Sequence, residues 1–330
     1  MIELDRRRAM ICAAGLLVGG MTTARLLPEE MLLRDRRPRR SRVAVVSAAE
    51  YSQRLEDVLL SSIREFHLNL CGKSVLLKPN LVEYIAGVEV NTRPVLVGAA
   101  AEAFLKLGAK SVVVGEGPGH QRDTYLVLAE SGLAAQLRSQ KISFVDLNRD
   151  ELFKVPTRAS YTGLGHLWLP RTVLESDFVV SMPKIKTHHW AGVTLSMKNM
   201  FGILPGTKYG WPKNVLHWKG IHRSVLDICA TAPLHFVIAD GVVAMEGNGP
   251  LHGTRRNLGK IVLADDPVAA DFTCARLMGL DPYRVWHLDR AAHFLGNGSY
   301  ERIDLIAETL PQKTIPFEVL PEFASLQTRV

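Results

Sequence analysis

Cysteine is scarce in this chain of 330 residues, and its spacing excludes several kinds of site. The four cysteines show no C-x-x-C or similar pairing, whereas zinc–thiolate sites and iron–sulfur clusters need several such ligands at short spacing. No iron–sulfur cluster is expected, and an iron–sulfur electron-transfer protein is the least favoured function. Three cysteines lie beyond the N-terminal leader, an odd number that argues against a disulfide framework.

Apolar runs long enough to cross a membrane are also missing. The apolar stretch near the N-terminus, residues 9–21, is shorter than the ~20 residues that span a bilayer, so no stable membrane span is expected. It follows three arginines and precedes Thr22-Thr23-Ala24, the order of an export signal. Residues 1–24 are therefore predicted to be a twin-arginine-type signal and residues 25–42 a basic linker. The twin-arginine machinery would make the protein periplasmic or otherwise exported; the alternative is an uncleaved N-terminus on a membrane surface.

The folded body has little excess charge, although the whole chain has a net charge of +7. Residues 1–42 contain ten arginines and five acidic residues, so only two of the excess positive charges belong to the remaining chain. Nucleic-acid binding needs a basic surface on the folded part. No nucleic-acid partner is expected for the body.

The body, residues 43–300, alternates short apolar runs with helical stretches. Continuous apolar strands separated by helices predict an α/β fold with a mostly parallel sheet and helices on both faces. Two α/β lobes around a cleft are the alternative arrangement. Residues 202–219 are expected to form a long irregular connection, typical of a binding loop, and residues 301–330 a C-terminal tail. Strands are expected at 43–47, 74–77, 111–114, 143–145, 177–182, 235–240 and 260–264, and helices at 51–70, 94–107, 267–278 and 282–293.

Several polar residues at predicted strand or helix ends are suited to an anionic ligand. Ligands of open α/β sheets bind at the carboxyl ends of strands, and a lysine or arginine there suits a carboxylate or phosphate. Asp240 is expected to end a strand, where it would orient a ligand. The predicted partner is a small anionic molecule, and the candidate substrate- or anion-binding residues are Lys78, Asn80, Arg93, Lys184, Lys186 and Asp240.

The segment from Pro183 to Gly206 is unusually rich in residues whose charge and nucleophilicity are easily tuned. Within it, His188 and Lys198 are candidate catalytic residues, and His188 and His189 are alternatives for the histidine that faces the site. His120, in a loop of three glycines, is the third catalytic candidate. Two later histidines, His217 and His222, are alternative metal ligands.

Several motifs resemble the family called domain of unknown function 362. The resemblance extends over roughly residues 43–293. The motifs are residues 184–206, His217, residues 239–241 with 245–250, residues 266–271 and Met278-Gly279.

A more distant resemblance is to the nickel-dependent lactate racemase family. Thr92-Arg93-Pro94, the loop at His120, His188 followed ten residues later by Lys198, Leu204-Pro205-Gly206 and His217 occur in the order of that family's motifs. The resemblance implies that Lys198 anchors a nickel pincer nucleotide, or another metal cofactor, and that His217 or His222 ligates the metal. It further implies that His120 and His188 exchange protons with the substrate and that Arg93 holds its carboxylate.

Together these features predict an exported metal- or metal-nucleotide-dependent enzyme. It would act on a small hydroxy-carboxylate or sugar acid as a racemase- or epimerase-like isomerase. The alternative is a non-catalytic periplasmic protein that binds an anion or a metal.

Overall fold

The computed structural model describes residues 33, 35–52, 54–119, 123–310 and 314–328. The predicted signal, most of the predicted linker before residue 35, and His120 lie outside the described residues. Asp35–Val330 form one compact unit, so the alternative of two lobes does not apply to it.

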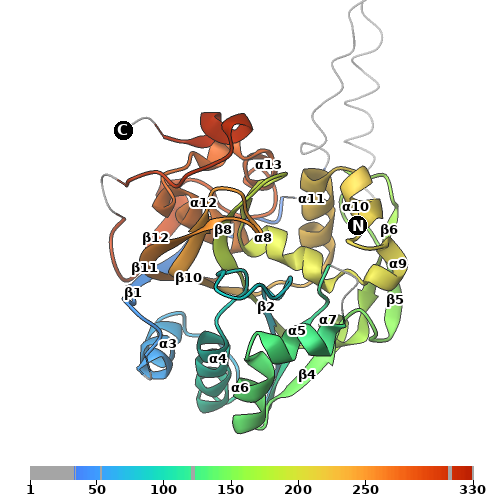
Figure 1. Cartoon of the computed structure of the whole chain (residues 1–330), viewed down its shortest axis with the longest axis vertical. Helices are drawn as coiled ribbons and strands as arrows, with labels where there is room; N and C mark the ends of the chain where they lie inside the picture. The colour runs from blue at the N-terminus through green and yellow to red at the C-terminus, as the bar shows by residue number, and fades with distance from the viewer. Residues whose placement is uncertain (1–32, 34, 53, 120–122, 311–313, 329–330) are drawn as a thin grey trace, which may run out of the picture. The chain divides into compact units, whose positions relative to one another are not determined.

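A ten-stranded sheet organises this unit (Figure 1). Six of its nine described strand pairs are parallel, which confirms the predicted mostly parallel sheet. Its central strands are apolar on both faces, as strands covered by helices on both sides must be. Its main order is β12 (Ile303–Leu305), β1 (Ser41–Ser47), β11 (Thr254–Ala264), β10 (Phe236–Glu246), β7 (Phe178–Met182), β2 (Ser74–Pro79), β3 (Ser111–Glu116) and β4 (Ser143–Asp146), and β8 (Lys184–His188) pairs with β10 and with β9 (Gly192–Thr194).

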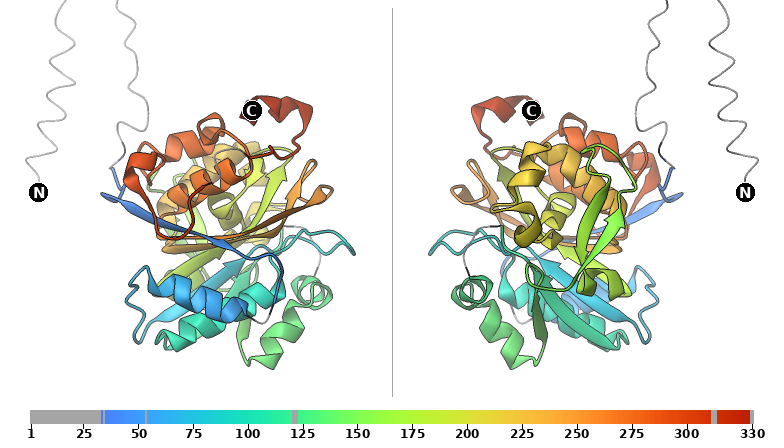
Figure 2. Two further views of the ribbon diagram at one scale, coloured as in Figure 1. Left: turned by 90° about the vertical axis from the view of Figure 1, so that its left-hand side faces the viewer. Right: turned by 90° about the vertical axis from the view of Figure 1, so that its right-hand side faces the viewer.

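Helices cover both faces of the sheet, as Figure 2 shows. The amphipathic helix α3 (Leu55–Arg64) buries Leu59 and Ile63 in a core with Phe104 and Phe236. Helix α12 (Pro267–Leu277) begins after Asp266, whose carboxylate caps it by accepting hydrogen bonds from the amides of Val268 and Ala269. One face is covered by α3 (Leu55–Arg64), α4 (Pro94–Lys106), α5 (Thr124–Glu130) and α6 (Leu133–Ser139), and the other by α11 (Ile221–Thr231), α12 (Pro267–Leu277) and α13 (Trp286–Ala291).

Shorter elements complete the unit. Strands β5 and β6 form a separate antiparallel pair. No helix of the described residues is long and apolar enough to cross a membrane. The short elements are β5 (Leu152–Pro156), β6 (His166–Pro170), α7 (Arg171–Glu175), α8 (Ser196–Asn199), η1 (Met200–Ile203), α9 (Gly206–Tyr209), α10 (Asn214–Trp218), η2 (Pro282–Arg284), η3 (Tyr300–Arg302) and η4 (Pro321–Leu326).

Two expectations from the sequence are wrong in ways that matter for the site. Asp240 does not end a strand, because β10 continues to Glu246 and pairs with β11, with a register shift between Gly241 and Val243. Residues 202–219 are not one irregular connection, since η1, α9 and α10 occupy much of this segment. The predicted C-terminal tail also contributes β12 to the sheet, where it pairs with β1.

Candidate functional site

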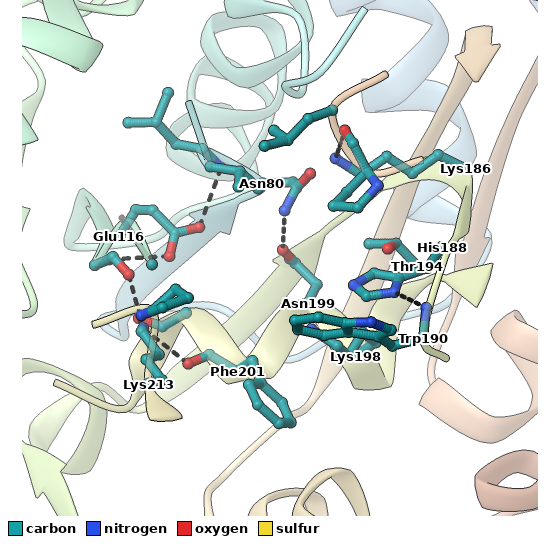
Figure 3. Close-up of a pocket in the computed structure, with 18 of the residues that line it drawn as sticks. Asn80, Glu116, Lys186, His188, Trp190, Thr194, Lys198, Asn199, Phe201 and Lys213 are labelled. Carbon is teal, nitrogen blue, oxygen red and sulfur yellow. Dashed lines mark hydrogen bonds between the residues drawn. The ribbon is translucent and has the colours of Figure 1, made fainter. Parts of the chain in front are cut away.

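A cavity of about 180 Å³ lies where β2 and β3 reach their carboxyl ends and where β8 follows β7. This is the edge of an open α/β sheet at which ligands bind. Lysines and histidines dominate its polar lining, which contains one carboxylate (Figure 3). The charged and titratable residues that line it are Lys78, Lys186, Lys198, Lys213, His188, His189, His217 and Glu116.

Lys78 and Glu116, from neighbouring strands β2 and β3, form a buried ion pair. Lys78 Nζ also donates to Asn199 Oδ1 at 2.9 Å, and the amide of Gly117 donates to Glu116 Oε1 at 2.9 Å. Gly202 packs so closely on the pair that a side chain there would collide with both. Burial lowers the pKa of Lys78, against the effect of Glu116. The positive charge of Lys78 is thus already balanced within the protein.

The hairpin of β8 and β9 places Lys186, His188 and Thr194 at the cavity. Lys186 and Thr194 lie directly opposite each other in the register of the hairpin. Lys186 Nζ donates to the carbonyl of Val90 at 2.7 Å but to no carboxylate among the described residues. Burial, then the charges of nearby lysines, lowers the pKa of Lys186 well below its usual value. The ammonium form of Lys186 therefore lacks the counter-charge that Lys78 has.

Lys198 is carried by the single turn of α8. The buried carboxylate of Asp271 fixes this turn by accepting hydrogen bonds from the amides of Ser196 (2.7 Å) and Met197 (3.0 Å). Lys198 Nζ lies 4.1 Å from the ring centroid of Phe201, and no hydrogen bond joins it to the described residues. Burial, and next the charge of Lys78, lowers the pKa of Lys198 to about 7. Near neutral pH about half of the Lys198 amines are uncharged and nucleophilic.

Lys213 reaches the cavity from the segment before α10. Its backbone is left-handed (φ 66°), and its Nζ donates to the carbonyls of Gly117 at 2.8 Å and Phe201 at 3.0 Å. Burial lowers the pKa of Lys213 to about 7. Lys213 therefore ties the loop after β3 to η1 and adds a second amine that is half charged at neutral pH.

The three cavity histidines differ in which ring nitrogen carries the proton. His188 Nδ1 accepts hydrogen bonds from the amides of Trp190 (3.0 Å) and Ala191 (3.2 Å), so the proton of the neutral ring is on Nε2. His189 Nδ1 lies 2.8 Å from the carbonyl of Gly249, and His217 Nδ1 lies 3.1 Å from that of Lys213. Because a carbonyl only accepts, these two rings carry the proton on Nδ1 and keep a lone pair on Nε2.

Burial keeps His188 and His217 neutral. Burial, and next the charge of Lys198, lowers the pKa of His188 well below its usual value. The same two causes lower the pKa of His217. His188 is accordingly a neutral donor through Nε2–H, whereas His217 offers an Nε2 lone pair to a proton or a metal.

Three of the predicted anion-binding residues form a network outside the cavity lining. Lys184 Nζ lies 2.7 Å from Asp240 Oδ2 and also donates to the hydroxyl of Tyr51 at 3.0 Å. Asp240 accepts from that hydroxyl at 2.7 Å and from the amide of Arg93 at 3.0 Å. The guanidinium of Arg93 pairs with Glu89. The structure thus uses these charges within the fold.

The predicted metal ligands are also separated. His217 lines the cavity, but His222 is hydrogen-bonded to the buried His287, with 2.7 Å between their Nδ1 atoms. No group of three or more His, Cys, Asp or Glu side chains in the described part of the chain is arranged to hold a metal ion. His120 lies outside the described residues, although Gly119 lines the cavity.

Other cavity residues were not expected from the sequence, chiefly Glu116, Lys213, Thr194 and Asn199. Glu116 could have been found, because it ends β3, which pairs with β2, and Lys78 lies at the carboxyl end of β2. Lys213 gave no such signal, since its position depends on a left-handed backbone within a segment expected to be irregular.

Comparison with known proteins identifies one matching family model. The model described as a domain of unknown function (DUF362) matches residues 75–276, most of the α/β body. A thylakoid-associated protein of Synechocystis sp. is 31% identical over 220 residues, which are 65% of this chain and 65% of the relative. The match therefore spans less than two thirds of that relative.

Two solved structures are similar at lower identity. The lactate racemase apoprotein of Thermoanaerobacterium thermosaccharolyticum is 16% identical, with a TM-score of 0.43 over 77% of this chain and 59% of that one. A structural-genomics protein from Thermotoga maritima is 12% identical, with a TM-score of 0.34 over 64% of this chain and 55% of that one.

Proposed function

The chain belongs to the DUF362 family, and from the chemistry of its cavity we propose that it is an enzyme that isomerises a small organic anion. One observation carries the proposal. Lys198, with a pKa of about 7, shares a cavity with His188 and His217 and has no hydrogen-bond acceptor among the described residues. An unpaired, partly neutral amine beside two imidazoles is typical of catalysis rather than of structural packing.

Each cavity group has a distinct proposed role. Lys186 and Lys213 attract the anionic group of the substrate, because neither is paired with a carboxylate in the described part of the chain. His188 donates a hydrogen bond through Nε2–H to an oxygen that gains negative charge, as a neutral imidazole can. The Nε2 lone pair of His189 accepts the proton of the substrate hydroxyl and returns it to that oxygen after the carbon has inverted. The favoured reaction is inversion at a hydroxyl-bearing carbon of a hydroxy-carboxylate or sugar acid.

The residues also fit a cofactor that brings its own metal ligands. Lys198 would hold the organic part through Nζ, and His217 would ligate the metal through Nε2, while the described residues do not form a complete protein site for a bare metal ion. Such a group, when bound, would supply an electrophile to the substrate carbon. The order of His188, Lys198 and His217 along the chain supports the nickel pincer nucleotide, as in the racemase motifs described above.

The test is intact mass spectrometry and metal analysis of the full chain purified from its native host. We expect about one metal per chain and added mass on the peptide that contains Lys198. Lys198→Ala should remove both the metal and the added mass. Lys219→Ala, at an exposed position, should remove neither of them. The loaded protein should convert a single enantiomer of lactate or malate into a mixture.

A binding protein without catalysis is the alternative that this experiment separates. Its signature would be unmodified, metal-free native protein that binds malate without converting it. If, in addition, Lys198→Ala binds malate with full affinity, the role assigned to Lys198 is refuted.

A further inference from the structure

Two polar side chains that line the cavity have buried atoms without a hydrogen-bond partner in the described part of the chain. They are Oδ1 of Asn80 and Oγ1 of Thr194. Asn80 is 6% exposed and Thr194 is 4% exposed. Buried polar atoms in native proteins are nearly always hydrogen-bonded. A bound molecule is therefore expected to supply the missing partners.

Hydrogen bonds fix which atom of Asn80 is free. Lys78 Nζ can only donate, so the side-chain atom of Asn199 that faces it at 2.9 Å must be Oδ1. That same oxygen lies 3.2 Å from the side-chain nitrogen of Asn80, which must then be the donor Nδ2. The remaining atom of Asn80 is Oδ1, an acceptor. A ligand must therefore offer a donor, such as a hydroxyl, at this position.

Thr194 lies beside the cation that would hold the anionic group of a ligand. It is paired directly with Lys186 across the β8–β9 hairpin, and such paired side chains are about 5 Å apart at Cβ. Figure 3 places Lys186, His188 and Thr194 on one side of the cavity and Glu116 and Lys213 on the other, with Asn80 and Asn199 between them. The hydroxyl of Thr194 can both donate and accept. It therefore suits a ligand hydroxyl close to the anionic group.

We propose that Asn80 and Thr194 form a subsite that recognises a hydroxyl group of an organic acid whose anionic group lies at Lys186. The inference rests on the proposed function and deepens it, because it assigns the specificity for hydroxylated over plain acids to two named residues. Asn80 Oδ1 accepts a hydrogen bond from the ligand hydroxyl, and Thr194 Oγ1 forms a second hydrogen bond with the ligand.

The test is isothermal titration calorimetry of the full chain with acids that differ by one hydroxyl. The probes are lactate against propionate and malate against succinate. We expect the hydroxylated acid of at least one pair to bind about 10-fold more tightly, because the plain acid leaves buried polar groups unpaired. Equal affinity within both pairs, or no binding of any of the four acids, would overturn the proposal.

Two variants test whether these residues cause the preference. Thr194→Val keeps the shape of the side chain and removes the hydroxyl, and Asn80→Ala removes the acceptor. Each should lower the affinity ratio several-fold and leave the affinity for succinate nearly unchanged. Thr273→Val is a matched control, because Thr273 Oγ1 is also buried and unpaired among the described residues but lies in α12 and does not line the cavity. Melting temperatures show whether each variant folds. If Asn80→Ala does not fold, the affinity ratio of Thr194→Val alone decides whether the subsite exists.

The outcome is distinguishable from failure of the proposed function. A ratio that Thr194→Val and Thr273→Val leave equally unchanged refutes the hydroxyl subsite, even if Lys198 proves to carry a cofactor. A ratio that falls in Thr194→Val supports the subsite, even if native Lys198 proves to be unmodified.

Discussion

Lys184 and Lys186 lie two residues apart on β8, yet their surroundings are electrostatically opposite. Lys184 is ion-paired with Asp240 and bonded to Tyr51, in a network of buried groups that satisfy one another. Lys186 has carbonyl acceptors but no carboxylate in the described part of the chain, and it faces the cavity. The register shift of β10 between its pairs with these two lysines separates the two environments.

The comparison teaches how a fold distinguishes a structural charge from one available to a ligand. Both side chains are fully buried, so burial alone does not separate them. The difference is the counter-charge, which the protein supplies to Lys184 and which we propose a ligand supplies to Lys186. Substitutions that remove either kind of counter-charge should therefore have different consequences.

The largest expected effect is that of Asp240→Asn. This change leaves the buried Lys184 with the more distant carboxylate of Glu89, 3.9 Å from its Nζ, in place of that of Asp240 at 2.7 Å. Breaking a buried pair in this way costs about 3–5 kcal/mol of the free energy of unfolding. Urea denaturation followed by circular dichroism measures it. Asp304→Asn is the control, because Asp304 and its partner Arg40 are 41% and 51% exposed, and exposed pairs contribute at most about 1 kcal/mol. Equal losses in the two variants would show that the Lys184 network is not structural.

The same strand shows how far the sequence could predict the site. The sequence proposed Lys186 as an anion-binding residue and His188 as a catalytic residue, and both line the cavity. It could not show that Lys184 faces Asp240, because that contact depends on the continuation of β10 past Gly241. Gly241 resembles a strand end locally, whereas the tertiary pairing of β10 with β11 extends the strand to Glu246.

The fold was more predictable than the partners of its charges. Strands β2 and β3, which carry Lys78 and Glu116 at their carboxyl ends, follow from apolar runs, and their parallel pairing follows from the helix between them. Whether a lysine is neutralised by a carboxylate or left for a ligand depends on residues distant in the sequence. Arg93, for example, lies at a helix N-terminus as predicted, but Glu89 holds its guanidinium.

A second, smaller effect should appear in the pH dependence of stability. Burial, and next the charge of Lys78, lowers the pKa of Lys198 from 10.5 to about 7 in the folded protein. Between these values the unfolded chain binds more protons, so stability rises with pH across this window and is lost as the pH falls towards 7. Each such group contributes at most about 1.4 kcal/mol per pH unit.

Lys198→Met should flatten this rise by about 2 kcal/mol between pH 7 and pH 9. Urea denaturation at the two pH values measures the difference for the wild type and the variant. Lys219→Met, at an exposed position, serves as the control. An unchanged slope in Lys198→Met would mean that the amine titrates alike in the folded and unfolded chains.

Lys186→Met should separate binding from stability. The variant removes a buried amine whose charged form no described carboxylate balances, so the free energy of unfolding should not fall. The affinity for malate should fall about 10-fold, because a charge-assisted hydrogen bond to the anion is lost. Calorimetry and urea denaturation measure the two quantities. A large loss of stability with unchanged affinity would make Lys186 a structural lysine like Lys184.

The smallest expected effect is proton uptake when an anion binds. Burial places the pKa of both Lys198 and Lys213 at about 7, so each amine is about half protonated at pH 7. An anion in the cavity favours the charged form, and binding should take up at most about half a proton per lysine. The heat of malate binding should therefore differ between phosphate and Tris buffers, whose ionisation enthalpies differ. Lys213→Met should reduce that difference, and Lys219→Met should not. Equal heats in both buffers would mean that anion binding does not change the protonation of the cavity amines.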